Sequence, residues 1–183
     1  MEQATRLAPA FSPGWSSLGY FYDLQGDLAA AQAAHERALA LMPANVYALL
    51  GLGAIALQRG DPAQALTHFG EALRRQPEYV KAIPDPIQNA LISTHLDLAL
   101  AYERLGRTAD AGQELATARQ LAEAAVTAWP MHPQARFQLA VVYWLAGETD
   151  KAETAFNDAA RCDASLAGER PRVEARLARL RGK

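Results

Sequence analysis

The sequence has only one cysteine, Cys162, in 183 residues. One cysteine cannot form an internal disulfide, and no cysteine and histidine spacing typical of a zinc site accompanies it. The chain also lacks an excess of either charge, because it has 20 acidic and 18 basic residues and a formal net charge of −2. This near balance argues against a broad basic face for nucleic acid and against polybasic docking on anionic lipid.

Long apolar segments are absent as well. The longest apolar run, residues 46–57, is too short to span a bilayer as a helix. The N-terminus lacks a basic stretch followed by an apolar core, so no signal peptide is predicted. Half of the residues are apolar and 21% are charged, which is a globular composition. We therefore expect a cytoplasmic protein, although a domain excised from an exported protein would have the same features.

Motifs for catalysis and for cofactors are also missing. The sequence contains no G-x-G-x-x-G, P-loop or G-x-S-x-G pattern. His68 and Glu71 lie three residues apart, but a metal site needs three or four ligands and no third ligand is evident. Cys162 has no histidine beside it in the sequence that would activate a thiolate. We therefore predict no catalytic residue, no bound metal and no cofactor, and a protein that is not an enzyme.

What the sequence does contain is an internal repeat. The pair Leu18-Gly19 recurs as Leu52-Gly53, and Gly26-Asp27 recurs at the same interval as Gly60-Asp61. A fixed period of roughly 20–50 residues is typical of stacked repeat architectures. The first part of the chain therefore contains two copies of one structural unit.

Two further copies extend the pattern with shifted spacing, and each keeps a Leu-Ala pair where the first two have Leu-Gly. The whole chain, 1–183, is predicted to be a single array. Its parts are the tail of a partial repeat at 1–11, repeats at 12–45 and 46–79, an insertion at 80–91, a third repeat at 92–125 whose second helix extends to 129, a fourth repeat at 133–166, and a capping helix at 168–182.

Each repeat is predicted to be a pair of antiparallel amphipathic helices joined at a glycine. Gly26 stands where the first helix ends, a position that favours a left-handed residue, and Asp27 can cap the next helix. Gly19 on the first helix and Ala31 on the second are small enough for the two helices to cross closely. The conformational cost of a glycine inside a helix is offset by that contact.

These residues resemble the tetratricopeptide repeat family. The pattern W-x2-L-G-x2-Y…A…A…P of that family is matched in repeat one by Trp15, Leu18, Gly19, Tyr22, Ala31, Ala38 and Pro43. The later repeats depart from it, because His95 and Arg136 replace the tryptophan, and Glu123 and Ala164 replace the closing proline. The resemblance implies an all-α fold, a right-handed α-α superhelix (solenoid) of antiparallel helix pairs, with about four TPR-like repeats plus a C-terminal capping helix.

In such an array the first helices of successive repeats line a concave groove. The predicted partner-binding residues lie on the face of these helices that repeat packing does not require. They are Tyr20, Tyr47, Leu50, Ala54, Leu57, Leu96, Leu100, Glu103, Phe137, Val141 and Trp144. Some members of the family hold a partner's C-terminal carboxylate with cations in the groove, but no cation stands at the matching positions here. The apolar character of the set favours an apolar or amphipathic partner segment instead.

The predicted function is a non-catalytic scaffold that binds another protein or peptide, with neither nucleic acid binding nor membrane insertion. The same apolar stripe could be covered by a neighbouring repeat, by the terminal helix or by a second copy of the chain. Two alternatives therefore stay open: a self-assembling structural module, which would be a homo-oligomer, and a regulatory or accessory region of a larger multidomain protein.

Overall fold

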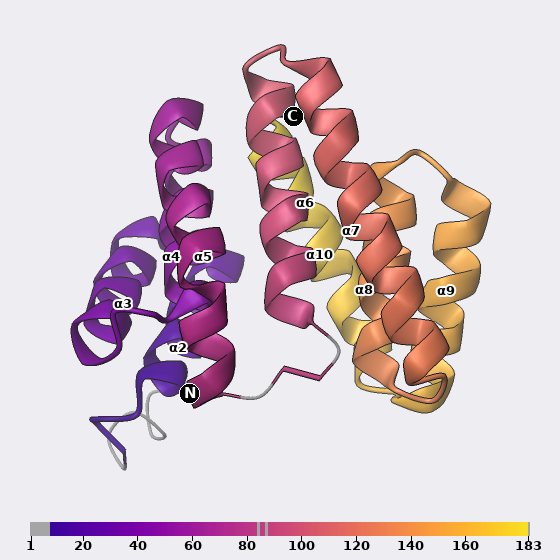
Figure 1. The fold of residues 1–183 in the computed structure, drawn as a ribbon, viewed down its shortest axis with the longest axis horizontal. Coiled ribbons are helices and arrows are strands. Elements are labelled where there is room, and N and C mark those ends of the chain that lie inside the picture. The colour runs from indigo at the N-terminus through magenta and orange to yellow at the C-terminus, as the bar shows by residue number, and fades with distance from the viewer. Residues whose placement is uncertain (1–7, 84, 87, 183) are drawn as a thin grey trace. The chain divides into compact units, whose positions relative to one another are not determined.

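The computed structural model describes residues 8–83, 85–86 and 88–182, and these residues form nine α-helices and no strand. Figure 1 shows them in chain order. They are α2 (Ser12–Gln25), α3 (Leu28–Leu41), α4 (Val46–Gln58), α5 (Pro62–Ala82), α6 (Asn89–Arg104), α7 (Thr108–Ala128), α8 (Pro133–Leu145), α9 (Thr149–Cys162) and α10 (Leu166–Arg181). The predicted all-α class is confirmed.

The first eight of these helices form four pairs, each joined by a tight turn. In the first pair, Gly26 has φ +82°, and its N–H and that of Asp27 donate to the carbonyls of Asp23 and Tyr22, both at 3.0 Å. Glycine adopts this left-handed conformation without a steric cost. The Asp27 carboxylate then accepts the N–H of Ala30 at 3.0 Å and caps α3. The turn chemistry predicted for Gly26 and Asp27 is confirmed, whereas α7 and α9 begin at Thr108 and Thr149 without a side-chain cap.

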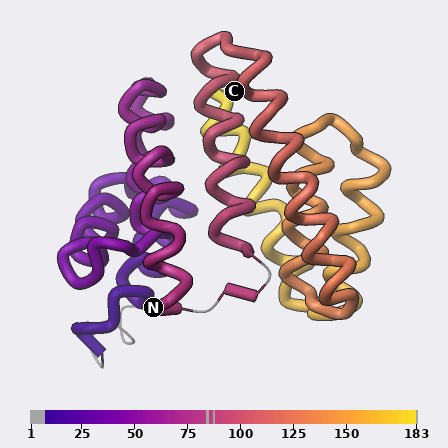
Figure 2. Tube along the Cα trace, in the orientation of Figure 1, coloured from indigo at the N-terminus to yellow at the C-terminus, as the bar shows by residue number. Residues whose placement is uncertain are grey.

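The chain divides into two compact units. Unit 1 comprises Met1–Pro84 and Ala178–Lys183, and unit 2 comprises Asp85–Leu177. In unit 1, α4 packs against both α2 and α3, and in unit 2, α8 packs against both α6 and α7. Each unit thus stacks two helix pairs and places its two first helices next to each other. The trace in Figure 2 follows the pairs of each unit in turn.

Small residues in unit 1 allow its helices to approach closely. A Cβ atom on Gly53 of α4 would lie 2.2 Å from Cε1 of Phe69 in α5. A Cβ atom on Gly51, also in α4, would lie 2.1 Å from Nε2 of His35 in α3. Both distances are far below van der Waals contact, so a larger residue at either position would require the facing ring to shift.

The segment that joins the second and third pairs, residues 83–88, lies within the predicted insertion. Helix α5 continues past Pro77 to Ala82, and Ile83 ends it in an extended conformation. Helix α6 begins at Asn89, whose N–H donates to the Asp85 carboxylate at 2.9 Å. Pro84 and Ile87 of the predicted insertion lie outside the described residues, as do residues 1–7 of the predicted partial repeat.

Membrane spans and metal sites are both absent from the part of the chain that the structure describes. Within it, no helix is both long enough and apolar enough to cross a bilayer. Within it, too, no group of three or more His, Cys, Asp or Glu side chains is placed to hold a metal ion.

Candidate partner-binding site

The predicted site residues all lie on the first helices of the four pairs. Tyr20 is on α2, and Tyr47, Leu50, Ala54 and Leu57 are on α4; Leu96, Leu100 and Glu103 are on α6, and Phe137, Val141 and Trp144 are on α8. The first five residues belong to unit 1 and the other six to unit 2. Because α2 contacts α4 and α6 contacts α8, each unit brings its own subset onto adjacent helices.

The predicted site residues differ in their exposure to solvent. Tyr20 is 39% exposed, Glu103 is also exposed, and Tyr47 and Trp144 are half-buried. The others are buried, namely Leu50, Ala54, Leu57, Leu96, Leu100, Phe137 and Val141. The apolar stripe is therefore largely covered in the structure. A partner that reaches its buried members has to displace the side chains that cover them.

Two of the aromatic site residues contact the second helix of their own pair. The rings of Tyr47 and Tyr79 meet edge to face with centroids 5.8 Å apart, and those of Phe137 and Phe156 do so at 5.3 Å. Such pairs contribute roughly 0.5–1.5 kcal/mol beyond the area they bury. These contacts fix the two site aromatics within α4–α5 and α8–α9.

At the N-terminal end of α2, a buried polar network joins it to α4. The Asn45 side chain donates from Nδ2 to Oγ of Ser12 at 2.8 Å and accepts the N–H of Ala48 at Oδ1 at 3.0 Å. Ser12 in turn donates to the carbonyl of Ala38 at 2.8 Å. Because buried polar groups are costly without partners, this satisfied network favours one alignment of α2 and α4.

The opposite ends of the same two helices carry a second polar cluster. Asp23 of α2 is only 2% exposed, and its Oδ1 accepts a hydrogen bond from Nε2 of Gln58 in α4 at 2.5 Å. The other segment of unit 1 reaches the same place, because Nη2 of Arg179 donates to the backbone carbonyl of Asp23 at 3.0 Å. Leu180, the next residue of α10, is fully buried.

Gln58 and Arg179 were not among the predicted site residues. Gln58 directly follows the predicted site residue Leu57, so its place on α4 was available as a signal. No sequence signal points to Arg179, because it lies 156 residues from its hydrogen-bond partner Asp23.

Unit 2 contains a cavity of about 360 Å³ between α7, α8 and α9, with Val126, Leu139 and Tyr143 among its lining residues. Of the charged groups at its rim, Arg136 pairs with Asp158 at 3.1 Å and Lys151 with Glu148 at 2.6 Å. These ion pairs lie within the unit and give the cavity no excess of either charge.

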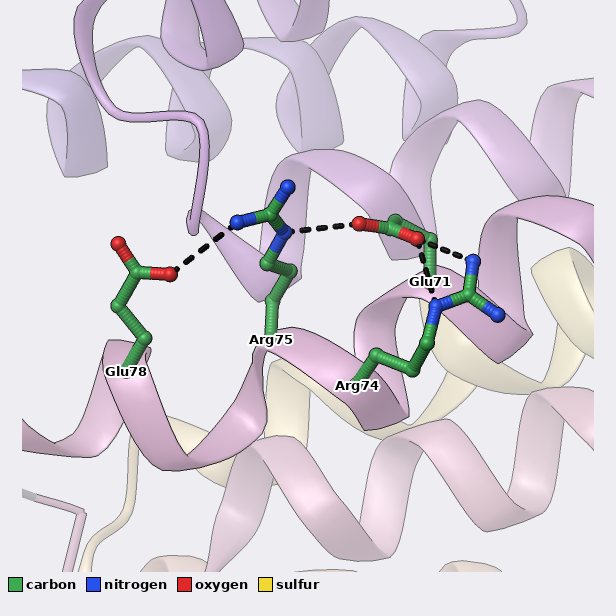
Figure 3. A network of polar contacts seen from close by, with 4 residues as sticks. All are labelled: Glu71, Arg74, Arg75 and Glu78. Carbon is green, nitrogen blue, oxygen red and sulfur yellow. Dashed lines mark hydrogen bonds and ion pairs between the residues drawn. The ribbon is translucent and has the colours of Figure 1, made fainter.

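A ladder of charges along α5 is the other conspicuous polar feature (Figure 3). Glu71 accepts from Nε of Arg75 at 2.7 Å and from Arg74, and Arg75 also reaches Glu78 at 3.3 Å. The hydrogen bond from Arg75, and then that from Arg74, lowers the pKa of Glu71. All of these partners belong to one helix, and surface pairs of this kind contribute little to stability. The ladder is a solvated helix face.

Comparison with solved structures gives distant likenesses. MamA, in a crystal structure, is 17% identical, with 91% of this chain and 86% of that chain covered and a TM-score of 0.44. PilW, a widely conserved type IV pilus biogenesis factor, is 20% identical, with 100% and 82% covered and a TM-score of 0.47. Both TM-scores are below 0.5, so neither likeness bears on what this chain does. No curated protein matches the chain.

Sequence models of one repeat family match both units. A model described as tetratricopeptide repeat matches residues 24–83, and a second model of the same description matches residues 90–165. Together they span more than half of the chain, and their limits enclose the pairs α4–α5 and α8–α9 and nearly all of α6–α7. The chain therefore belongs to the tetratricopeptide repeat family.

Proposed function

We propose that this protein is a non-catalytic scaffold that binds an apolar or amphipathic segment of another protein on the predicted face of its first helices. Membership of the tetratricopeptide repeat family supports an interaction role in general. The observation that carries the specific proposal is the adjacency of the first helices. Since α2 contacts α4 and α6 contacts α8, apolar residues from successive repeats continue across neighbouring helices.

The chemistry of this face favours apolar recognition. Glu103 is the only charged residue among the eleven predicted site residues. Each large apolar side chain that a partner buries contributes roughly 1.5–3 kcal/mol before entropy losses. A micromolar complex needs about 8 kcal/mol net, so a few such anchors suffice.

Alanine substitution of the accessible site residues tests this proposal, because truncating a buried leucine would also damage the fold. Tyr20 and its neighbour Phe21 provide a matched pair, with exposed fractions of 39% and 41%. Successive residues of a helix point about 100° apart, so the two rings lie on different faces of α2. Trp144→Ala extends the test to unit 2.

The measurement is quantitative affinity capture from the native lysate with the wild-type chain and each variant as bait. We expect Tyr20→Ala and Trp144→Ala to reduce recovery of a common partner several-fold, while Phe21→Ala retains it. Equal recovery by all three variants would contradict the proposed face. Recovery of the untagged chain itself, and of nothing else, would favour the self-assembling alternative.

A further inference from the structure

We propose that the last turn of α10, residues 178–181, occupies the unit 1 part of this site as a built-in ligand. The site then selects partner helices of the same chemistry, in which an arginine adjoins a leucine. This inference rests on the proposed function, because it names the partner chemistry of the same face. It also makes the C-terminal turn a competitor that a partner has to displace.

The first step of the argument is the anchoring of Arg179. The Asp23 carbonyl that accepts its hydrogen bond lies in the last turn of α2 and also accepts the N–H of Gly26 at 3.0 Å. A carbonyl has two lone pairs and can accept both donors. The C-terminal end of a helix carries partial negative charge, so a guanidinium is favoured there. An arginine on a partner helix would meet the same acceptor.

The second step is the burial of Leu180. The ends of helices and chains are usually the least ordered and most exposed positions. Leu180 is nevertheless 0% exposed, whereas Arg172, two turns earlier in α10, is exposed. The terminal turn of α10 is therefore held by apolar contact as well as by the hydrogen bond of Arg179.

The third step connects this turn to the predicted site. Gln58, which donates to the Asp23 carboxylate, directly follows the site residue Leu57 in α4. Leu57 and Ala54 are both 0% exposed. Within unit 1, the anchored turn thus meets the last turn of α2 at the backbone carbonyl of Asp23, the residue whose carboxylate accepts the hydrogen bond of Gln58 in α4. Residues 178–181 therefore lie at the end of α2, beside the polar cluster that joins it to α4.

Charge complementarity further restricts which kind of partner helix can bind. The cluster at this end of α2 and α4 contains the buried acid Asp23 and the neutral Gln58, and the occupying turn contains Arg179 and Arg181. An acidic helix would place its charge against the Asp23 carboxylate and the negative end of α2. We therefore assign a basic amphipathic helix, with leucine as the apolar anchor, as the partner segment.

The experiment measures binding of a fluorescein-labelled peptide, residues 169–183 of this sequence, to the full chain by fluorescence anisotropy. In the wild-type chain the tethered turn competes with the peptide. Leu180→Asp in the full chain releases that turn without altering α2 or α4. When the tethered turn occupies the site, the peptide cannot bind, so the apparent affinity of the wild-type chain is reduced by the fraction of molecules in that closed state. We therefore expect the peptide to bind the Leu180→Asp chain at least about tenfold more tightly than the wild-type chain.

Arg179→Ala serves as a second variant that removes the guanidinium and leaves the anchor Leu180 in place. It should tighten peptide binding in the same direction by about tenfold, the factor expected for the loss of one hydrogen bond to a charged group. Circular dichroism establishes that each variant keeps its helices. If Leu180→Asp does not fold, the result for Arg179→Ala decides the question.

Two peptides of equal charge provide the matched control. Leu180→Asp and Arg172→Gln each lower the charge of the peptide by one, but only the first removes the anchor, since Arg172 is exposed and pairs with Glu169. We expect the Arg172→Gln peptide to bind the released chain and the Leu180→Asp peptide not to bind it. Equal binding of the two peptides, or equal affinity of wild-type and released chains, would overturn the inference.

Failure of this inference can be told apart from failure of the proposed function. If Tyr20→Ala weakens capture of a partner but the released chain does not bind the peptide, the face is used and its chemistry differs from that of α10. If the peptide binds the released chain but Tyr20→Ala leaves capture unchanged, the site exists and the proposed partner face is wrong.

Discussion

The first two repeats have the same helix arrangement, but they bury different aromatic rings at equivalent positions. His35 in α3 and Phe69 in α5 occupy equivalent positions of the two repeats, and both rings are buried, at 1% and 0% exposure. The Phe69 ring packs against Gly53 of α4. The His35 ring packs against glycines of two helices, Gly19 of α2 and Gly51 of α4. Both repeats therefore place an aromatic ring against a glycine at this position. The ring is polar in the first repeat and apolar in the second.

A second contrast concerns the tenth position of each repeat. Ile55 of α4 is 2% exposed, whereas Phe21 of α2, at the same position of the first repeat, is 41% exposed. The helix α3 packs against α4 and supplies the neighbour that an inner repeat requires. Equivalent positions in a repeat protein thus differ in burial, depending on whether a preceding repeat packs against the helix that carries them.

The largest effect is expected from a charge at that tenth position. Ile55→Asp places a carboxylate in a buried apolar site and should lower the free energy of unfolding by about 5 kcal/mol or more. Phe21→Asp should change it by less than about 1 kcal/mol, because the side chain already contacts solvent. Urea denaturation followed by circular dichroism measures both. Similar losses in the two variants would refute the contrast in burial.

Removal of the ring in the second repeat comes next. Phe69→Ala should lower the free energy of unfolding by about 4 kcal/mol, because it leaves a cavity against Gly53. Thermal unfolding gives the comparison, with the exposed Phe11→Ala as the control for loss of a phenyl ring. If Phe69→Ala lowers the free energy of unfolding no more than Phe11→Ala does, Phe69 is not packed against α4.

The chemical difference between the two rings can be tested by making them alike. His35→Phe installs the residue of repeat two in repeat one, and we expect it to raise the free energy of unfolding by about 1 kcal/mol, because a buried imidazole loses more hydration than a phenyl ring does. Chemical denaturation at pH 7 measures the change. A destabilised variant would show that the space between Gly19 and Gly51 fits only the smaller ring.

The smallest effect concerns His68, the neighbour of Phe69. Burial lowers its pKa below the ordinary value of 6.5. The unfolded chain therefore binds more protons than the folded chain between the two pKa values, and stability falls as the pH drops through about 6.5. His68→Gln should flatten this part of the stability profile. An unchanged profile between pH 7.5 and pH 5.5 would exclude His68 as its source.

The fold was predictable from sequence because its determinants are local. A glycine with positive φ followed by a capping aspartate sets the turn at Gly26 and Asp27, and both act within a few residues of themselves. The helix boundary at Pro77 was less predictable. Helix α5 continues to Ala82 because a proline inside a helix removes a single hydrogen bond, which the rest of a long helix can tolerate.

The site was only partly predictable. The helix face that carries Tyr20 and Leu57 follows from the repeat pattern, but the burial of Leu57 does not. The contact of the C-terminal turn with α2 does not follow either, because the hydrogen bond of Arg179 to Asp23 links residues at opposite ends of the sequence. Sequence spacing carries no information on such a contact.

The most direct test of the account is photo-crosslinking in the native cell with p-benzoylphenylalanine at Tyr20 or at Phe21. The two positions are adjacent and almost equally exposed, and only Tyr20 lies on the proposed binding face. The account predicts a discrete crosslinked partner from Tyr20 and none from Phe21. Crosslinks of equal yield from both positions, or from Phe21 alone, would contradict it.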